Sequence, residues 1–219
     1  MSPPRQRIYI VDDHTLVREW LGNLLRQESD FEVCGATDTA PAALSGMAAS
    51  RPDIAVIDLS LKGGSGLELI KDLRGVSPGT RVVVLSMHEE IYYVERAFRA
   101  GARGYVTKHD STHSIVEAIR TVLAGKIYAR AEILGQLAAR MVGQTVRQTA
   151  NAGELLSDRE LEVFRRLGQG QATRKIATEM GLSMKTVQAY SARIKDKLGL
   201  ANASELMREA VRWTSTPSQ

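Results

Sequence analysis

The chain has 219 residues, a formal net charge of +4 and 43% hydrophobic residues, a composition typical of a globular protein with one or two domains. Its one cysteine, Cys34, excludes an intramolecular disulfide and fits a reducing compartment. The apolar runs are too short to cross a membrane and the first residues lack a signal-peptide pattern, so we expect a cytoplasmic protein with no membrane partner.

The excess of positive charge lies in the C-terminal part of the chain. Residues 157–212 contain 11 Lys and Arg against 7 Asp and Glu, an excess of +4, whereas the rest of the chain is balanced. This asymmetry favours a polyanionic partner such as nucleic acid. A solvated basic surface would give the same composition, and charge alone leaves both interpretations open.

The first half of the chain alternates short apolar runs with amphipathic stretches. The apolar runs predict five strands, at residues 8–13, 31–36, 53–59, 81–87 and 102–108. The amphipathic stretches predict five helices, at residues 14–27, 39–49, 66–74, 90–100 and 114–124. In the first of these helices, one apolar stripe comprises Leu16, Val17, Trp20, Leu21, Leu24 and Leu25.

Five strand–helix units in series predict a parallel sheet with helices on both faces, because the strands are continuous apolar runs. The expected fold class is therefore an α/β domain, a doubly wound five-stranded parallel sheet of flavodoxin-like type, followed by a small all-α helix-turn-helix domain. The polar segment 143–154 predicts a flexible linker after a further helix at 131–142. The expected domain limits are 1–125, a linker with one helix at 126–154, and 155–219.

Polar and charged residues stand where the predicted strands end. They are Asp12 and Asp13 after the first strand, Asp58 after the third, Ser86 after the fourth, and Lys108, just after Tyr105, at the fifth. Because the carboxyl ends of parallel strands meet at one edge of a sheet, these side chains should converge there. The glycine-rich loop after Asp58 would let the backbone approach this pocket closely.

Three clustered carboxylates repel one another, and a hard cation such as Mg²⁺ relieves that repulsion. A carboxylate beside Mg²⁺ is also a setting for phosphoryl transfer, in which the carboxylate is the nucleophile and the metal neutralises charge. Lys108 could then pair with the phosphoryl oxygens. The expected cofactor is therefore Mg²⁺.

This set of residues resembles the receiver domain of bacterial two-component response regulators, over about residues 6–125. The resemblance implies that Asp58 accepts the phosphoryl group, and that Asp12, Asp13, Asp58 and the backbone carbonyl of Ser60 hold Mg²⁺. It further implies that Lys108 pairs with the phosphate, that Ser86 is the switch hydroxyl and that Tyr105 is the aromatic switch. Two positions depart from the usual pattern, because Lys62 replaces a common proline and Met87 replaces a common alanine.

The segment 156–200 contains the start and stop signals of three helices. Ser157 and Glu160 form a predicted capping box, and Gly168 and Gly170 end the helix. Thr173 is the expected cap of a second helix, which ends at Gly181, and Ser183 the cap of a third, which ends at Gly199. Helix, short turn and helix is the arrangement that places one helix in the major groove of DNA.

This segment resembles the LuxR-type helix-turn-helix of the NarL/FixJ response regulators, over about residues 153–213. The resemblance makes 183–198 the recognition helix, and implies phosphate contacts from Lys185, Thr186, Arg193, Lys195 and Lys197. Base edges would be read by Gln188, Ala189 and Ala192, which favour A·T pairs. Many members have lysine at 188, histidine at 190 and arginines around Asn202, whereas this chain has Gln188, Tyr190, Ala201 and Ala203.

The remaining positions of this domain have a structural interpretation. The expected core comprises Ile176, Ala177, Leu182, Val187, Ile194 and Leu198. The last helix, 204–213, is used by the family to pair DNA-binding domains, which would make Leu206, Ala210 and Trp213 dimerisation residues. Packing within their own domain is the competing interpretation, and both can hold together. For Arg165 and Arg166 a solvated surface charge is favoured over a DNA contact.

Together these resemblances imply a transcriptional response regulator and not an enzyme. A sensor histidine kinase would phosphorylate Asp58, Tyr105 would turn inward, and a homodimer would bind double-stranded promoter DNA, with RNA polymerase as a further partner. One alternative keeps the receiver as a constitutive dimerisation module, independent of phosphorylation. A phosphatase-like hydrolase is disfavoured, because such enzymes need a second acid two residues after the nucleophile, where this chain has Ser60.

Overall fold

The computed structural model describes residues 4–61, 64–110, 112–141 and 152–215. The chain divides into two compact units, Met1–Val142 and Gly143–Gln219, which are described separately below. In the described ranges, the helices are too short or too polar to span a lipid bilayer.

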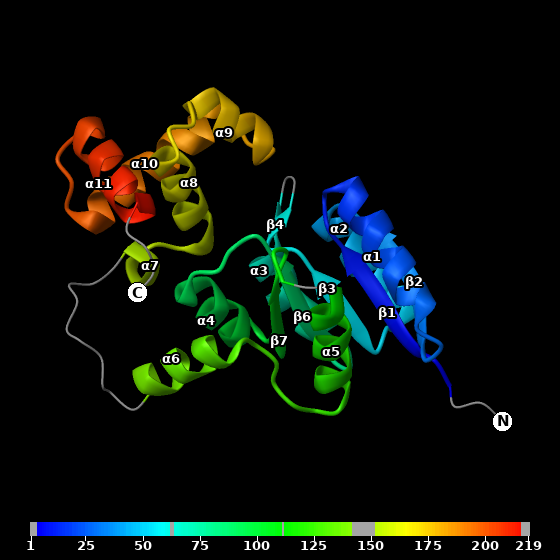
Figure 1. Ribbon diagram of the computed structural model, residues 1–219. Helices are drawn as coiled ribbons and strands as arrows, with labels where there is room; N and C mark the ends of the chain where they lie inside the picture. The colour runs from blue at the N-terminus through cyan, green and yellow to red at the C-terminus, as the bar shows by residue number, and fades with distance from the viewer. Residues whose placement is uncertain (1–3, 62–63, 111, 142–151, 216–219) are drawn as a thin grey trace. The chain divides into compact units, whose positions relative to one another are not determined.

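The first unit is built on a parallel sheet of five strands in the order β2-β1-β3-β6-β7 (Figure 1). These strands are β1 (Gln6–Val11), β2 (Phe31–Thr37), β3 (Ile54–Ile57), β6 (Arg81–Ser86) and β7 (Gly104–Thr107). All residues of β3 and β7 are buried, because helices cover both faces of the sheet. The predicted fold class of this unit is confirmed, and the order changes direction beside β1, where ligands gather in such sheets.

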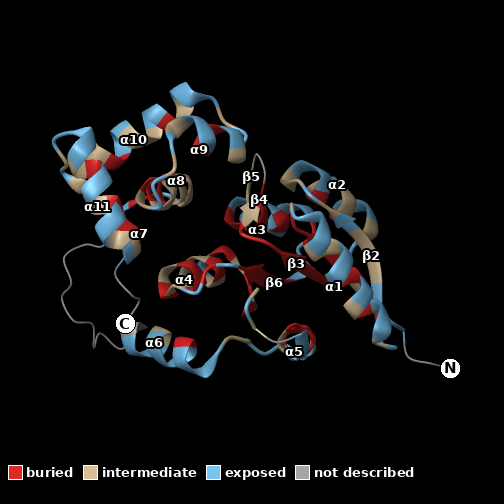
Figure 2. Cartoon of the chain, turned by 45° about the horizontal axis from the view of Figure 1, so that its top comes forward, coloured by how far each residue is buried: buried red, intermediate tan, exposed pale blue. Residues whose placement is uncertain are grey.

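Five helices form two layers, one on each face of the sheet. They are α1 (Thr15–Gln27), α2 (Ala40–Ser50), α3 (Gly66–Val76), α4 (Ile91–Ala100) and α5 (Thr112–Leu123). The apolar sides of α1 and α5 share one core cluster with the sheet, through Leu21, Leu25, Ile115 and Ile119. On the other face α2 contacts α3, and α3 contacts α4. Figure 2 shows the buried residues along the strands and the exposed ones on the outer sides of the helices.

Three features of this unit differ from the prediction. The apolar stripe of α1 is buried at Leu21 and Leu25, but Leu16 is 80% exposed and Trp20 is 43% exposed. A short antiparallel hairpin, β4 (Ser60–Leu61) and β5 (Gly64–Ser65), occupies the expected loop after β3. The helix α6 (Ala131–Met141), which was expected in the linker, contacts α4 and belongs to the first unit.

The second unit contains helices only. They are α7 (Ala152–Leu155), α8 (Asp158–Gly168), α9 (Thr173–Glu179), α10 (Met184–Leu198) and α11 (Ala203–Ser215). The helix α8 is central, because it contacts α9, α10 and α11. Of the predicted core, Ile176, Ala177, Val187 and Ile194 are buried, and Leu182 and Leu198 are half-buried. Most of the predicted flexible linker lies outside the described residues, and its last residues begin α7.

The helix caps explain where these helices start. Ser157 and Glu160 form the predicted capping box of α8, and the Ser183 hydroxyl accepts a hydrogen bond from the Thr186 backbone N–H at the start of α10. The expected cap at Thr173 is wrong, because Thr173 is the first helical residue and the N-cap is Ala172. Gly199 ends α10 with a φ of 66°, a left-handed conformation that glycine adopts without strain.

Candidate functional site

The predicted strand-end residues of the first unit converge into one pocket. The Asp58 backbone N–H donates to the Val11 carbonyl, and the Lys108 N–H donates to the Ser86 carbonyl, so neighbouring strands hold these residues side by side. Asp12 and Asp58 are buried, with Asp58 only 3% exposed. The structure therefore brings Asp12, Asp13, Asp58, Ser86 and Lys108 to the carboxyl edge of the sheet.

Lys108 is the cation shared by the two buried carboxylates. Its Nζ lies 2.6 Å from Asp58 Oδ2 and 2.7 Å from Asp12 Oδ2. Burial raises the pKa of Asp58 to about 6, an effect that Lys108 opposes and that the Asp12 charge increases. Burial alone would lower the pKa of Lys108, but the two carboxylates outweigh it and raise the pKa above its ordinary value. The pocket is thus a compact cluster of charges, in which the pKa values of Asp58 and Lys108 depend on the charges of their neighbours.

The donor chemistry of the pocket fits Mg²⁺. Ligand atoms of Asp12, Asp13, His14 and Asp58 all lie within 4.8 Å of one another. Buried Asp12 Oδ2 and Asp13 Oδ1 accept no hydrogen bond of good geometry, although each lies near a nitrogen, of Lys108 and of His14 respectively. Carboxylate oxygens with spare acceptor capacity are what a hard divalent cation binds. His14 was missed by the sequence analysis, although it directly follows the acidic pair.

Ser60 sits beside this cluster, in the hairpin that follows β3. Its backbone N–H donates to Asp58 Oδ1 at 3.1 Å, which orients the carboxylate. Gly66 comes directly after the hairpin. A Cβ atom at this position would lie 2.1 Å from the Asp58 carbonyl oxygen, so only glycine fits here without a shift of the backbone. Lys62, the residue that departs from the usual proline, lies outside the described residues.

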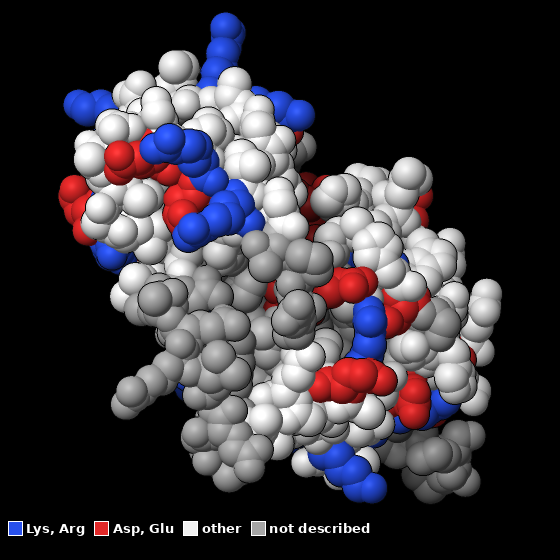
Figure 3. Space-filling view, turned by 60° about the vertical axis from the view of Figure 1, so that its left-hand side comes forward, with Lys and Arg blue, Asp and Glu red and all other residues white. Residues whose placement is uncertain are grey.

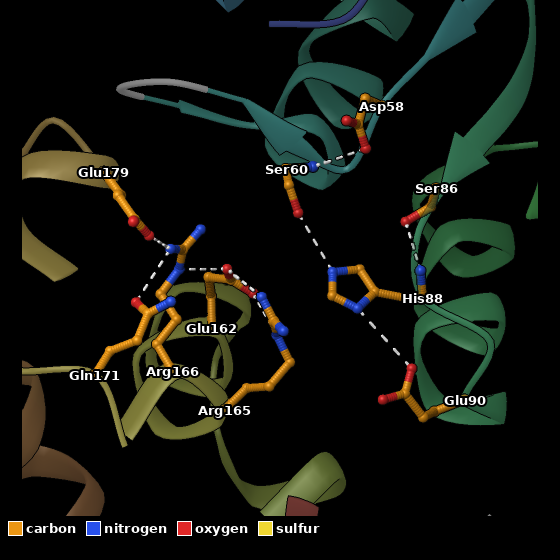
Figure 4. A network of polar contacts seen from close by, with 10 residues as sticks. All are labelled: Asp58, Ser60, Ser86, His88, Glu90, Glu162, Arg165, Arg166, Gln171 and Glu179. Atoms are coloured by element: carbon orange, nitrogen blue, oxygen red, sulfur yellow. Dashed lines mark hydrogen bonds and ion pairs between the residues drawn. The ribbon is translucent and has the colours of Figure 1, made fainter. Parts of the chain in front are cut away.

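Ser86 and Tyr105 are joined through the backbone of His88. The Tyr105 hydroxyl donates to the His88 carbonyl at 3.0 Å. The His88 N–H donates to Ser86 Oγ at 3.2 Å (Figure 4). The His88 ring stacks on Tyr93 and lies 3.3 Å from Ser60 Oγ. Tyr105 is buried, so the inward position expected after phosphorylation is the position that it has in this structure.

In the second unit, α10 presents a polar and basic outer face. Lys185, Gln188, Ala189, Ala192 and Arg193 are exposed, and Thr186 and Lys195 are half-buried. Residues 185, 188, 189 and 192 follow the spacing of one helical face, so the predicted base-reading residues share a face with Lys185. Figure 3 shows one side of the molecule, over which Lys and Arg side chains are interspersed with those of Asp and Glu.

Lys197 has a partner within its own domain. Its Nζ lies 2.6 Å from Oε2 of Glu160, the buried capping-box residue of α8. Arg165 and Arg166 likewise pair with Glu162, and Arg166 also pairs with Glu179 of α9 (Figure 4). The three basic side chains are thus engaged internally. Arg165 and Arg166 are not the solvated charges that were expected, because their side chains are ion-paired and only 16% and 14% exposed, and this pairing disfavours a DNA contact. The pair with Glu160 weakens a phosphate role for Lys197.

The predicted dimerisation residues of α11 face the interior of the domain. Leu206 and Ala210 are buried, and the Trp213 ring packs on Phe164 of α8 with ring centroids 5.6 Å apart. Their burial supports packing within the domain, the competing interpretation. The exposed apolar residues of α11 are instead Met207 and Val211, which line a shallow groove of about 580 Å³ with Ser204, Arg208, Arg212 and Ser215.

Comparisons with known proteins agree with both parts of this description. The family described as response regulator receiver domain matches residues 8–120, and the family of bacterial regulatory proteins described as luxR matches residues 154–210. The transcriptional regulatory protein UhpA of Salmonella typhimurium is 36% identical over 199 residues, 91% of this chain and 94% of UhpA. The oxygen regulatory protein NreC of Staphylococcus aureus is 31% identical over 210 residues, 94% of this chain and 97% of NreC.

Two solved structures of response regulators are also similar to this chain. A LuxR-family response regulator from Aurantimonas sp. has a TM-score of 0.59 at 33% identity and covers 63% of this chain and 99% of its own. The response regulator RcsB of Salmonella typhimurium matches in fold, with a TM-score of 0.68 at 23% identity over 97% of this chain and 100% of its own. Members of this family are DNA-binding transcriptional regulators and not enzymes. This chain belongs to the family of two-component response regulators, with a receiver domain followed by a LuxR-type DNA-binding domain.

Proposed function

We propose that this response regulator is switched in the cytoplasm by transfer of a phosphoryl group from a sensor histidine kinase to Asp58, which promotes homodimerisation and promoter binding. The observation that carries the proposal is the buried carboxylate of Asp58, held by Lys108 Nζ at 2.6 Å at the carboxyl edge of the sheet. Uptake of a phosphoryl group from a small-molecule donor, with and without Asp58, tests it.

The roles of the pocket residues follow from their contacts. An Asp58 carboxylate oxygen attacks the phosphorus atom, and the bond from phosphorus to the donor breaks. Lys108 Nζ, which now pairs with Asp58 Oδ2, is placed to pair with the phosphoryl oxygens instead. The Ser86 hydroxyl, held by the His88 N–H, is the second group that the new charge would attract.

A Mg²⁺ ion would be held by Asp12, Asp13, Asp58 and the backbone carbonyl of Ser60. Bound there, it would neutralise negative charge on the transferred group. The protein's own contribution is to keep Asp12 and Asp13 buried or half-buried beside Asp58, so that the ligands need little rearrangement.

For the second unit we propose that α10 enters the major groove of DNA. Lys185, Thr186, Arg193 and Lys195 would contact phosphates, and Lys197 would do so only after it leaves Glu160. Gln188, Ala189 and Ala192 would read base edges with a preference for A·T pairs. Selection of duplexes from a random-sequence pool checks this preference, and a selected half-site recognised through G·C pairs would contradict it.

Pairing of two DNA-binding domains is proposed to use the outer face of α11. Met207→Glu places a charge on the exposed apolar patch and is expected to reduce dimeric DNA complexes severalfold without unfolding the domain, because Met207 is exposed. Leu206→Ala is the matched contrast. It removes a buried side chain and is expected to destabilise the domain by about 3 kcal/mol.

Sedimentation of the protein–DNA complex and thermal unfolding measure these two effects. Unchanged dimeric complexes in the Met207→Glu variant would exclude the outer face of α11 from the dimer.

Met87 is proposed to slow the loss of the phosphoryl group. It directly follows Ser86 and is 54% exposed, so its long side chain is not committed to the core and can hinder an attacking water molecule. Met87→Ala is expected to shorten the lifetime of the phosphorylated protein severalfold. The rate of dephosphorylation after removal of the donor measures this, and an unchanged rate would disprove the role.

One observation favours a second candidate function. Tyr105 already has its buried position, with its hydroxyl bonded to the His88 carbonyl. A receiver in which this position does not depend on phosphorylation could act as a constitutive dimerisation module. The two functions differ in whether a phosphate mimic changes the affinity for DNA.

A further inference from the structure

Tyr190 and Arg193 form a contact on α10 that differs from the other interactions of this helix. They lie three residues apart, so their side chains are neighbours on the helix surface. Arg193 is exposed and Tyr190 is half-buried. The guanidinium carbon of Arg193 lies 5.1 Å from the centroid of the Tyr190 ring, within the range of a cation–π interaction.

The position of the pair relates it to the proposed DNA-reading face. At 100° per residue, Arg193 stands at the edge of the face formed by residues 185, 188, 189 and 192, and Tyr190 stands further round toward the interior. A basic side chain at the edge of a recognition helix is suited to the DNA backbone, whereas the centre of the face reads base edges.

Stacking on a ring leaves the charge of Arg193 available, unlike an ion pair. Within the described residues, Arg193 forms no ion pair with a carboxylate, whereas Lys197, one turn further, is paired with Glu160 at 2.6 Å. A ring attracts one face of the guanidinium, and the N–H donors around its edge stay free for a bidentate contact with phosphate. Arg193 therefore keeps both its charge and its donors for an external anion.

Stacking also restricts the arginine side chain before DNA binds. An exposed arginine samples many rotamers, and ordering them on binding costs conformational entropy. A side chain that already rests on a ring loses less freedom when it reaches a phosphate, so the same contact gives a higher affinity.

We propose that Tyr190 is a positioning residue, whose ring holds the Arg193 guanidinium at the edge of α10 for contact with a DNA phosphate. The proposal rests on the proposed DNA-binding role of α10. Tyr190 acts through its ring face and not through its hydroxyl group, and it acts on DNA only through Arg193.

A double-mutant cycle on the full-length protein tests this. Binding is measured by fluorescence anisotropy with Mg²⁺ and beryllofluoride, on a duplex that the wild-type protein selects from a random-sequence pool. The variants are Tyr190→Ala, Tyr190→Leu, Tyr190→Phe, Arg193→Ala, Lys185→Ala and the double variant Tyr190→Ala/Arg193→Ala. Phe keeps the ring without the hydroxyl group, and Leu keeps apolar bulk without a ring.

The expected pattern has three parts. Tyr190→Ala and Tyr190→Leu weaken binding about threefold, and Tyr190→Phe binds like the wild type. Arg193→Ala weakens binding further and lowers the slope of log affinity against log salt by about two, which is about one for each subunit of the bound dimer. The double variant binds no more weakly than Arg193→Ala alone, because Tyr190 has no route to DNA except through Arg193.

Several results would overturn the proposal. Wild-type binding by Tyr190→Ala or Tyr190→Leu would show that the ring is not needed. Weak binding by Tyr190→Phe, or a double variant weaker than Arg193→Ala, would show that Tyr190 contacts DNA itself. If Lys185→Ala and Arg193→Ala both leave binding unchanged, the proposed DNA-binding face of α10 is wrong. If these two weaken binding and Tyr190→Ala does not, only the positioning role fails.

Discussion

The Asp58→Asn variant is expected to take up no phosphoryl group from phosphoramidate and Mg²⁺, whereas the wild-type chain takes up one. The amide has no anionic oxygen to attack phosphorus, and no other aspartate of the pocket is held by both a cation and the backbone N–H of Ser60. Intact-mass spectrometry measures the uptake. Asp72→Asn is the matched control, because Asp72 is an exposed aspartate on α3 and its variant should be phosphorylated normally.

A phosphorylated Asp58→Asn variant would contradict the assignment of Asp58.

A measurement of stability separates loss of the nucleophile from loss of the fold. Burial raises the pKa of Asp58 to about 6 from 3.8, so the folded receiver disfavours the charged carboxylate. In metal-free buffer above pH 6, Asp58→Asn should therefore be more stable than the wild type. The difference should shrink as the pH falls through the pKa of Asp58, because the wild-type carboxyl group then becomes neutral.

The Glu160→Ala variant is expected to lose about 2 kcal/mol of stability in the DNA-binding domain. Glu160 is buried, its carboxylate accepts the Ser157 backbone N–H at 2.7 Å, and it pairs with Lys197 Nζ at 2.6 Å. The substitution removes half of the capping box of α8 and the anchor of α10 at once. Thermal unfolding followed through Trp213 fluorescence, in a Trp20→Phe background, should show a midpoint lower by about 10 °C.

Two observations check the cause of this effect. Burial would raise the pKa of Glu160, but the hydrogen bonds from Lys197 and Ser157 outweigh it and hold the pKa below its ordinary value of 4.5. The stabilisation should therefore be present above pH 4.5 and disappear as the pH falls through the lowered pKa. Asp196→Ala, at an exposed carboxylate on α10, is the control. Equal unfolding midpoints for Glu160→Ala and the wild type would mean that this pair does not anchor the recognition helix.

The pocket could be predicted from the sequence because its geometry follows from the regular alternation of strands and helices along the chain. Each strand of a parallel sheet ends at the same edge, so residues that follow successive apolar runs must meet. Asp12, Asp58, Ser86 and Lys108 obey this rule, and the structure places them together. The capping signals at Ser157 and Ser183 were equally informative, because a cap is satisfied within four residues of the chain.

Contacts between distant residues could not be predicted in this way. Lys197 and Glu160 are 37 residues apart, and His88 and Ser60 are 28 residues apart, so only the fold shows that they meet. The sequence left the buried side of α11 undecided for a related reason. On α11, residues 206, 210 and 213 form one stripe and 207 and 211 form its neighbour, and both stripes contain apolar residues. Tertiary packing on α8 decides which stripe is buried.

The most direct test of the switch is the affinity of the full-length protein for a selected promoter duplex, with Mg²⁺ and with or without beryllofluoride, for the wild type and Asp58→Asn. The account predicts that the phosphate mimic shifts the wild type to a dimer that binds DNA more tightly and leaves Asp58→Asn unchanged. Equal DNA binding by both proteins, with or without the mimic, would contradict it and would identify the receiver as a constitutive dimerisation module.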